Sequence, residues 1–188
     1  VTFHDGSALT ADAIKFTYDR IVDPETKSQV AFSALGPYDS TEVVDPQTAT
    51  IAFKSPYAPF LNSVSSVILA PLPPAVVEEL GLDFGTRPVG TGPFMFDSYE
   101  IGAQLRMVKN PDYKWGPTMF THEGPAYLDA ITWRIIPEDA TRLAALQSGE
   151  VHIIQTVPTQ DFATVQANSD LAIIEAVHLM ALALLGAA

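Results

Sequence analysis

Apolar side chains near the start of the chain recur at the spacing of one helix face. They stand at Ile14, Tyr18, Ile21 and Val22. This spacing predicts a helix over residues 11–22 that buries one face. Thr10 is a favourable N-cap residue for this helix, and Asp23-Pro24 is expected to end it.

The next stretch of the chain predicts short elements. Two strands, at residues 41–44 and 50–54, flank a turn that carries Pro46 at its second position. Residues 27–38 show no sustained period and contain serine, glycine and proline, so we expect a loop there. The apolar run at residues 67–70 is expected to form a short buried strand.

Prolines mark two short helices in the same stretch. Pro59 can stand in the first turn of a helix over residues 60–64. Pro73-Pro74 can open another helix, which runs to Leu80 and ends at Gly81.

Longer elements are predicted in the second half of the chain. Strands are expected at residues 94–97, 105–109, 127–136 and 151–154, and helices at residues 140–146, ended by Gly149, and 161–167, capped by Thr159. Alternation at Ile131, Trp133 and Ile135 gives the third strand one buried face. The order strand, helix, strand from residue 127 to 154 predicts a parallel pair with a right-handed crossover.

Residues 87–96, here called the Gly/Pro segment, separate these two styles of pattern. Pro88 and Pro93 fix their own φ angles, and Gly90 and Gly92 allow backbone geometry that a side chain would forbid. A phosphate-binding loop is excluded, because the segment leads into a strand pattern and such a loop must open a helix. We interpret the segment as the boundary between two units, residues 1–87 and 88–188.

Composition narrows the function classes. Hydrophobic residues make up 47% of the 188 residues and charged residues 17%, as in a globular chain. The formal net charge of −12 disfavours nucleic acid as a partner, since nucleic-acid binders present basic surfaces to phosphates. The chain has no cysteine, and no apolar run is long enough to cross a bilayer.

Catalytic and metal sites are not indicated. The four histidines, His4, His122, His152 and His178, are scattered without a metal-ligand spacing, and no Gly-x-Ser-x-Gly elbow occurs. Acidic neighbours such as Glu138-Asp139 suit solvation and helix caps better than shared acid-base work. The sequence therefore predicts no catalytic residue, no metal and no cofactor.

Three ordered motifs carry a family resemblance. Residues 88–94, Pro-Val-Gly-Thr-Gly-Pro-Phe, resemble a signature of the solute-binding proteins that serve ABC importers of peptides, nickel and opines. Residues 3–21 and 135–151 resemble two further signatures of the same family, with His152 in place of the usual Asp. The Asn110-Pro111 element also resembles the family, although Lys114 is inserted before Trp115.

The resemblance implies a fold and a role. The fold is the α/β periplasmic-binding-protein type II fold, with residues 1–87 as the small extra α+β subdomain and 88–188 as part of the first lobe, a mixed sheet. The second lobe is expected to be absent from this chain. The role is an extracytoplasmic receptor, periplasmic or a cell-surface lipoprotein, that delivers a small peptide-like solute to a membrane ABC permease without chemistry. Peptide, nickel chelate, opine, glutathione and sugar all remain open as the solute.

The resemblance also implies where the solute lies. One wall of the cleft is expected after the Asp-Pro-x-Thr turn and before the Gly/Pro segment, with the floor in that segment. The implied ligand-binding residues are Ser28, Gln29, Val30, Ala31, Phe32, Ala70, Pro71, Thr91 and Gly92. A cleft of this kind can read a peptide through main-chain hydrogen bonds and small pockets.

Two further expectations remain open. As a lobe fragment, the chain should bind peptides weakly and self-associate through its apolar residues 179–185, which should lack strand partners. The rival function is an acidic α/β enzyme or enzyme accessory domain whose catalytic residues lie outside these 188 residues. Permease and ATPase genes beside this one would favour the receptor.

Overall fold

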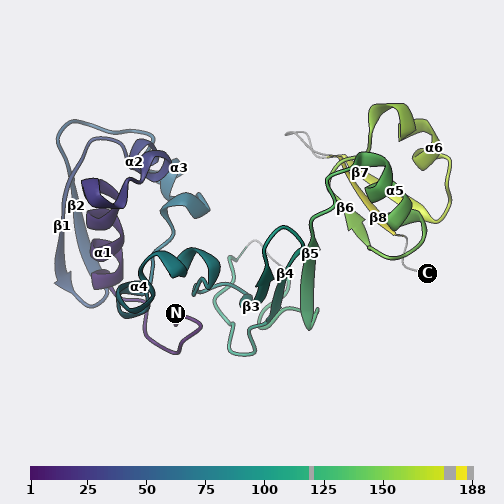
Figure 1. Cartoon of the computed structure of the whole chain (residues 1–188). Helices are drawn as coiled ribbons and strands as arrows, with labels where there is room; N and C mark the ends of the chain where they lie inside the picture. Colours follow the sequence, from purple (N-terminus) through teal and green to yellow (C-terminus); the bar gives the residue numbers. More distant parts are fainter. Residues whose placement is uncertain (119–120, 176–180, 186–188) are drawn as a thin grey trace. The chain divides into compact units, whose positions relative to one another are not determined.

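The computed structural model describes residues 1–118, 121–175 and 181–185. The chain forms two compact units (Figure 1). The first unit comprises Val1–Glu100 with Leu105–Thr132, and the second comprises Ile101–Gln104 with the chain from Trp133 onward. Both units mix helices and strands, which confirms the predicted α/β class. The division at residue 88 concerns the family's domain plan and stays a prediction.

Helix α1 (Ala11–Val22) lies against the hairpin of β1 (Tyr38–Asp45) and β2 (Thr48–Phe53), as Figure 1 shows. The helix has the predicted bounds, and the hairpin is antiparallel with Glu42 opposite Thr50. Thr10 occupies the N-cap position, but its hydroxyl donates to Asp12 and makes no cap bond to the backbone.

The loop predicted over residues 27–38 is wrong, because helix α2 (Gln29–Leu35) forms there. Its inward face carries Ala31, Ala34 and Leu35, which pack into the core of the first unit. Gly36 ends the helix at φ 73°, where an added Cβ would meet the Tyr57 ring at 2.6 Å. The spacing of Ala31, Ala34 and Leu35 is helical, but alanine gives a weak apolar signal.

The strand predicted at residues 67–70 is also wrong. The structure has a 3₁₀ helix, η2 (Val67–Leu69), in which Leu69 is buried while Val67 and Ile68 are exposed. A run of four apolar residues does not distinguish a strand from a helical turn, and here Ser66 caps the turn by accepting from the Ile68 N–H.

The remaining short helices follow the predicted prolines. Helix α3 (Phe60–Val64) begins after Pro59, and α4 (Pro74–Leu80) begins after Pro73. Two more 3₁₀ helices complete this part of the chain: η1 (Pro24–Thr26) and η3 (Gly81–Thr86).

A three-stranded sheet follows, with strand order β3 (Phe94–Glu100), β4 (Gln104–Lys109) and β5 (Ala130–Arg134). The buried face predicted for β5 is wrong within the described residues. Trp133 is 59% exposed and Ile135 is also exposed, although they alternate as a buried strand face would. Alternation shows that two side chains share a face, but it does not show that anything covers that face.

The second unit packs helices against a small antiparallel sheet (Figure 1). Its elements are α5 (Asp139–Gln147), β6 (Ile153–Ile154), η4 (Thr159–Asp161), α6 (Phe162–Gln166), β7 (Leu171–Glu175) and β8 (Ala181–Leu185). The strand order is β6-β8-β7. The predicted cap at Thr159 is wrong, because Thr159 is itself the first residue of η4.

The predicted parallel pair is wrong. Strand β5 belongs to the sheet with β3 and β4, whereas β6 pairs antiparallel with β8, with Ile153 opposite Leu184. Strand β8 also pairs with β7, so the expectation that this tail lacks strand partners is wrong for residues 181–185. Residues 179 and 180 lie outside the described residues.

Candidate functional site

His4 fixes the middle of the Gly/Pro segment. Its backbone N–H donates to the Gly90 carbonyl at 2.8 Å, and its ring Nδ1 accepts from the Gly90 N–H at 3.3 Å. With Nδ1 accepting, the ring proton sits on Nε2, which donates to the Gly92 carbonyl at 3.0 Å. One residue near the start of the chain thus binds the segment at three points.

Asn110 and Trp115 hold the neighbouring carbonyls. The buried Asn110 donates from Nδ2 to the Gly92 carbonyl at 3.2 Å and from its backbone N–H to the Pro93 carbonyl at 2.9 Å. Trp115 donates from Nε1 to the Thr91 carbonyl at 2.8 Å, and its ring packs edge-on against Tyr113. His4, Asn110 and Trp115 come from motifs far apart in sequence, and the fold brings them to one segment.

The N–H groups of this segment are paired differently from its carbonyls. Within the described part of the chain, neither the Thr91 N–H nor the Gly92 N–H donates a hydrogen bond. Thr91 and Gly92 are both half-buried. Residues 90–93 therefore combine four carbonyls that each accept a hydrogen bond with two N–H groups that donate none.

Gly90 and Gly92 do not use the backbone freedom that glycine allows. Neither has a positive φ, and a Cβ would lie 3.8 Å from the His4 ring at Gly90 and 3.9 Å from the Phe94 carbonyl at Gly92. Both distances are ordinary van der Waals contacts. The bare backbone at these positions is open to close approach from outside the described residues.

The first group of predicted ligand-binding residues lies on α2. Ser28 is the N-cap residue, Gln29 and Val30 are exposed, and Ala31 faces the core. Phe32 is 53% exposed and lines an open surface pocket of about 590 Å³ with Tyr38 and Lys54 among its other walls. This helix offers a side-chain surface and no free backbone donor beyond its first turn.

Ala70 and Pro71 follow η2 in extended backbone, with Ala70 exposed and Pro71 half-buried. Helix α2 contacts η2, so these two groups of predicted residues are neighbours in the first unit. Thr91 and Gly92 belong to the same unit. Across the described residues, no hydrogen bond joins the Gly/Pro segment to α2 or to Ala70 and Pro71.

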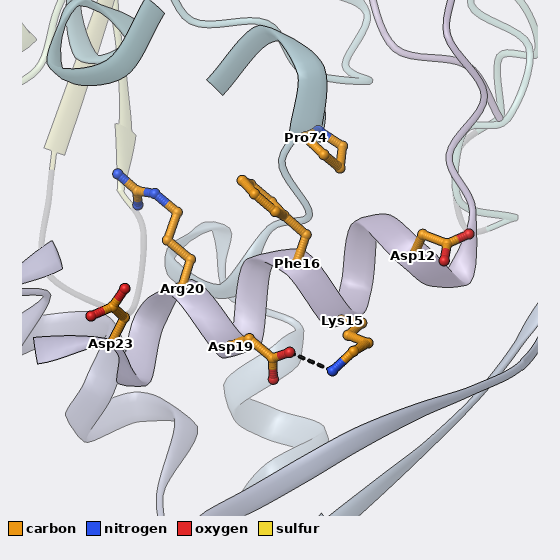
Figure 2. A pocket seen from close by; sticks show the side chains of 7 residues that line it. All are labelled: Asp12, Lys15, Phe16, Asp19, Arg20, Asp23 and Pro74. Atoms are coloured by element: carbon orange, nitrogen blue, oxygen red, sulfur yellow. Dashed lines mark hydrogen bonds and ion pairs between the residues drawn. The ribbon is translucent and has the colours of Figure 1, made fainter. Parts of the chain in front are cut away.

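Another open pocket, of about 530 Å³, lies on the outer side of α1 (Figure 2). It is lined by Asp12, Lys15, Phe16, Asp19, Arg20, Asp23 and Pro74. Figure 2 shows the Lys15 ammonium paired with the Asp19 carboxylate, at 2.5 Å. The charged residues of this surface fall on the polar face of a regular helix, so the sequence pattern does not distinguish them from an ordinary solvated helix face.

Titratable groups in the first unit respond to burial and to ion pairs. Burial, together with the Tyr38 hydroxyl's hydrogen bond to Asp19, raises the pKa of Tyr38 to about 12. Burial also raises the pKa of Tyr18. Hydrogen bonds from Arg106 and Lys109 lower the pKa values of Asp97 and Asp129, respectively.

The described residues hold no group of three or more His, Cys, Asp or Glu side chains that could bind a metal ion. His4 serves the Gly/Pro segment, His122 bonds the Pro125 carbonyl, and His152 is exposed. His178 lies outside the described residues. Among the helices in the described ranges, none is both long and apolar enough to cross a membrane.

Comparison with known proteins gives consistent matches. The family model "Bacterial extracellular solute-binding proteins, family 5 Middle" matches residues 1–184. The glutathione-binding protein GsiB of Pectobacterium atrosepticum is 32% identical over 93% of this chain and 32% of its own length. GsiB of Escherichia coli O157:H7 is 31% identical over 96% of this chain and 34% of its own.

Solved structures of similar fold carry bound solutes. AgaA of A. tumefaciens R10, in complex with agropinic acid, has a TM-score of 0.81 and 26% identity, covering 92% of this chain and 34% of its own. DppA of Helicobacter pylori, in complex with the peptide STSA, has a TM-score of 0.79 and 25% identity, covering 93% and 36%.

The chain spans about a third of the length of the curated relatives that it matches. These matches confirm the resemblance drawn from the three motifs and the periplasmic-binding-protein fold. The chain belongs to family 5 of the bacterial extracellular solute-binding proteins.

Proposed function

We propose that the chain forms part of the extracytoplasmic receptor of an ABC importer, which captures a small peptide-like solute and delivers it to a membrane permease. The match of one solute-binding family over residues 1–184 carries the proposal. The relatives are named as binding proteins, so the enzyme alternative is not favoured. The receptor acts in the periplasm or as a cell-surface lipoprotein and catalyses no reaction.

The domain plan is part of this proposal. Residues 1–87 form the small extra subdomain of the first lobe, and residues 88–188 form part of that lobe. The Gly/Pro segment lies at the division, and its glycine backbone is open to close approach. A peptide, glutathione or opine has the size and the polar ends that a ligand-binding cleft can hold.

The solute contacts two kinds of surface. Residues 28–32 together with Ala70 and Pro71 supply one wall, in which the exposed Phe32 ring offers the largest apolar contact. Thr91 and Gly92 supply the floor through their backbone. The contact between α2 and η2 supports a continuous wall.

The test is calorimetry on the protein expressed from its complete gene, with glutathione and the tetrapeptide Ser-Thr-Ser-Ala as probes. We expect one of them to bind and to be recovered chemically unchanged by mass spectrometry. Phe32→Ala should weaken that binding about tenfold or more, because a fully buried aromatic side chain contributes about 1.5–3 kcal/mol. Leu82→Ala is the matched control, since Leu82 is exposed and away from the proposed wall.

Chemical conversion of a bound probe would replace the receptor with the enzyme alternative. Unchanged affinity in a folded Phe32→Ala variant would remove α2 from the wall. The 188 residues alone should bind these probes more weakly than about 1 μM, because one wall leaves much of a ligand exposed to water. Sedimentation should show self-association of this chain, because large apolar side chains such as Val67, Leu82 and Ile101 are more than 80% exposed. Tight binding by its monomer would contradict the two-lobe proposal.

A further inference from the structure

The carbonyls of residues 90 to 93 are all engaged by donors from other segments. His4 takes the Gly90 and Gly92 carbonyls, Trp115 takes the Thr91 carbonyl, and Asn110 takes those of Gly92 and Pro93. A backbone carbonyl has two lone pairs, and the Gly92 oxygen uses both. Each acceptor in this stretch therefore has at least one donor from the protein, and the Gly90, Thr91 and Pro93 oxygens each keep one lone pair.

The N–H groups of residues 90–93 differ in whether they donate a hydrogen bond. The Gly90 N–H is bound to His4 Nδ1, and Pro93 has no N–H. Only the Thr91 and Gly92 N–H groups and the Thr91 hydroxyl make no hydrogen bond within the described residues. Any molecule that meets this stretch is offered donors from successive residues.

The glycines make those donors reachable. Gly90 and Gly92 have ordinary φ angles and room for a Cβ, so neither conformation nor local packing requires glycine at either position. A Cβ there would instead occupy space beside the Thr91 and Gly92 N–H groups. Glycine leaves that space to an atom from outside.

We infer that His4, Asn110 and Trp115 are positioning residues that hold residues 90–93 of the Gly/Pro segment so that the Thr91 and Gly92 N–H groups donate to an acceptor oxygen of the solute. The inference rests on the proposed function, because it assigns these N–H groups to the solute of the receptor. The recognised group is a carboxylate or carbonyl oxygen, since both accept from adjacent N–H groups. A cationic end of the solute would meet carbonyl oxygens that each already accept at least one hydrogen bond from the protein.

A first experiment tests, without any solute, whether the Thr91 and Gly92 N–H groups are free. Amide hydrogen exchange of the 188-residue chain, followed by NMR, should show the Thr91 and Gly92 amides exchanging within about tenfold of an unstructured peptide. The Gly90 amide, bonded to His4, should exchange far more slowly. Strong protection of Thr91 and Gly92 in the absence of solute would overturn the inference, whatever the protein binds.

A second experiment adds the solute. The protein from the complete gene is saturated with whichever of glutathione or Ser-Thr-Ser-Ala it binds, and exchange is measured again. We expect the Thr91 and Gly92 amides to become protected. Binding without that protection would overturn the inference and leave the proposed function intact. If neither probe binds, the result counts against the proposed function alone, and the first experiment decides whether the Thr91 and Gly92 amides are free.

Variants separate positioning from general stability. Trp115→Phe keeps an aromatic ring beside Tyr113 but loses the donor to the Thr91 carbonyl. Trp133→Phe is the matched control, because Trp133 is exposed and its indole N–H donates no hydrogen bond within the described residues. Affinity for the bound probe should fall about threefold to tenfold in Trp115→Phe and stay unchanged in Trp133→Phe. Solute-dependent protection of Thr91 and Gly92 should weaken in parallel.

Asn110→Asp tests the same point with little change of shape. It keeps the acceptor for the Asp112 N–H and replaces the donor to the Gly92 carbonyl with a carboxylate oxygen. The C-terminal amide of the tetrapeptide then distinguishes the two oxygens. Equal losses of affinity for the tetrapeptide acid and for its amide indicate that a carbonyl oxygen is recognised. A larger loss for the acid indicates a carboxylate. If neither Trp115→Phe nor Asn110→Asp loses affinity for either peptide, the inference is contradicted.

Discussion

The two buried clusters of the chain are built from different chemistry. In the first unit the cluster is Tyr18, Ile21, Leu35, Tyr38 and Leu69, and in the second it is Leu143, Leu146, Ile154, Val157 and Val165. The first contains two tyrosines and the second only aliphatic side chains. The first cluster thus depends on hydrogen bonds as well as apolar burial, and the second on burial alone.

Polar groups inside the first unit are satisfied in a connected network. The Tyr38 hydroxyl donates to Asp19 at 2.6 Å and lies 2.9 Å from the Thr41 hydroxyl, while its ring packs edge-on against Tyr18. The buried Thr17 hydroxyl donates to the Ala13 carbonyl and accepts from the Leu72 N–H. Such a network fixes which element packs where, but it adds groups that can titrate.

The largest expected effect comes from removing a side chain of the aliphatic cluster. Leu146 is fully buried, and Leu146→Ala should destabilise the second unit by about 2–5 kcal/mol through lost burial and a cavity. Hydrogen exchange followed by mass spectrometry measures the loss segment by segment. We expect α5 and β6 to lose protection while α1 keeps it.

Leu35→Ala is the matched change in the first cluster, because Leu35 is equally buried. It should give a loss of similar size, confined to α1, α2 and the hairpin. Equal loss of protection in both units from either variant would show that the two clusters unfold together. The two clusters would then not be independent sources of stability.

A high-pH transition is the next largest effect, and it belongs to the first cluster alone. Tyr38 is 4% exposed and its pKa is raised to about 12, from an ordinary value near 10 in the unfolded chain. Folding therefore favours the neutral phenol, so its stabilisation is complete below pH 10 and is lost as pH rises from about 10 to 12. The free energy of unfolding should fall by about 2–3 kcal/mol over that range.

Denaturant titrations at several pH values, with the Tyr38→Phe variant beside the unmodified chain, test this effect. The variant should be less stable at neutral pH by about 1–2 kcal/mol, because Asp19 and Thr41 lose a partner. Its slope above pH 10 should be shallower. A slope that Tyr38→Phe leaves unchanged would assign the transition to another group, of which Tyr18 is the nearest candidate.

Local signals in the sequence predicted the helices well and the sheet partners badly. Helix α1 has the predicted bounds because its apolar period and its Asp23-Pro24 end are both local. Helix α2 was missed because two of its three inward residues are alanines. The partners of β5 and β6 were wrong because a period identifies a strand but carries no information on which strand it meets.

The candidate site likewise combines local motifs that the sequence shows with long-range contacts that it does not show. The motifs of the Gly/Pro segment could be read from the sequence, and so could the family. The bonds from His4, Asn110 and Trp115 could not, because each joins residues that are 17 to 88 positions apart. Whether residues 28–32 and Thr91 bind the solute stays a prediction.

The smallest expected effect tests how far the polar network of the first cluster reaches toward solvent. Lys15 pairs with Asp19 Oδ2, the same carboxylate whose Oδ1 accepts from Tyr38, and both charged side chains are more than 40% exposed. An exposed pair four residues apart on a helix contributes about 0.3–0.5 kcal/mol, and salt screens it. Lys15→Gln should therefore cost about that much at low salt and almost nothing in about 1 M NaCl. Urea titrations of Lys15→Gln at both salt concentrations give the comparison. Arg87→Gln is the control, since Arg87 pairs with Asp83, whose carboxylate has no buried partner among the described residues. A cost above about 1 kcal/mol that persists at high salt would show that Lys15 belongs to the buried network, because screening acts on solvent-exposed charges far more than on buried ones.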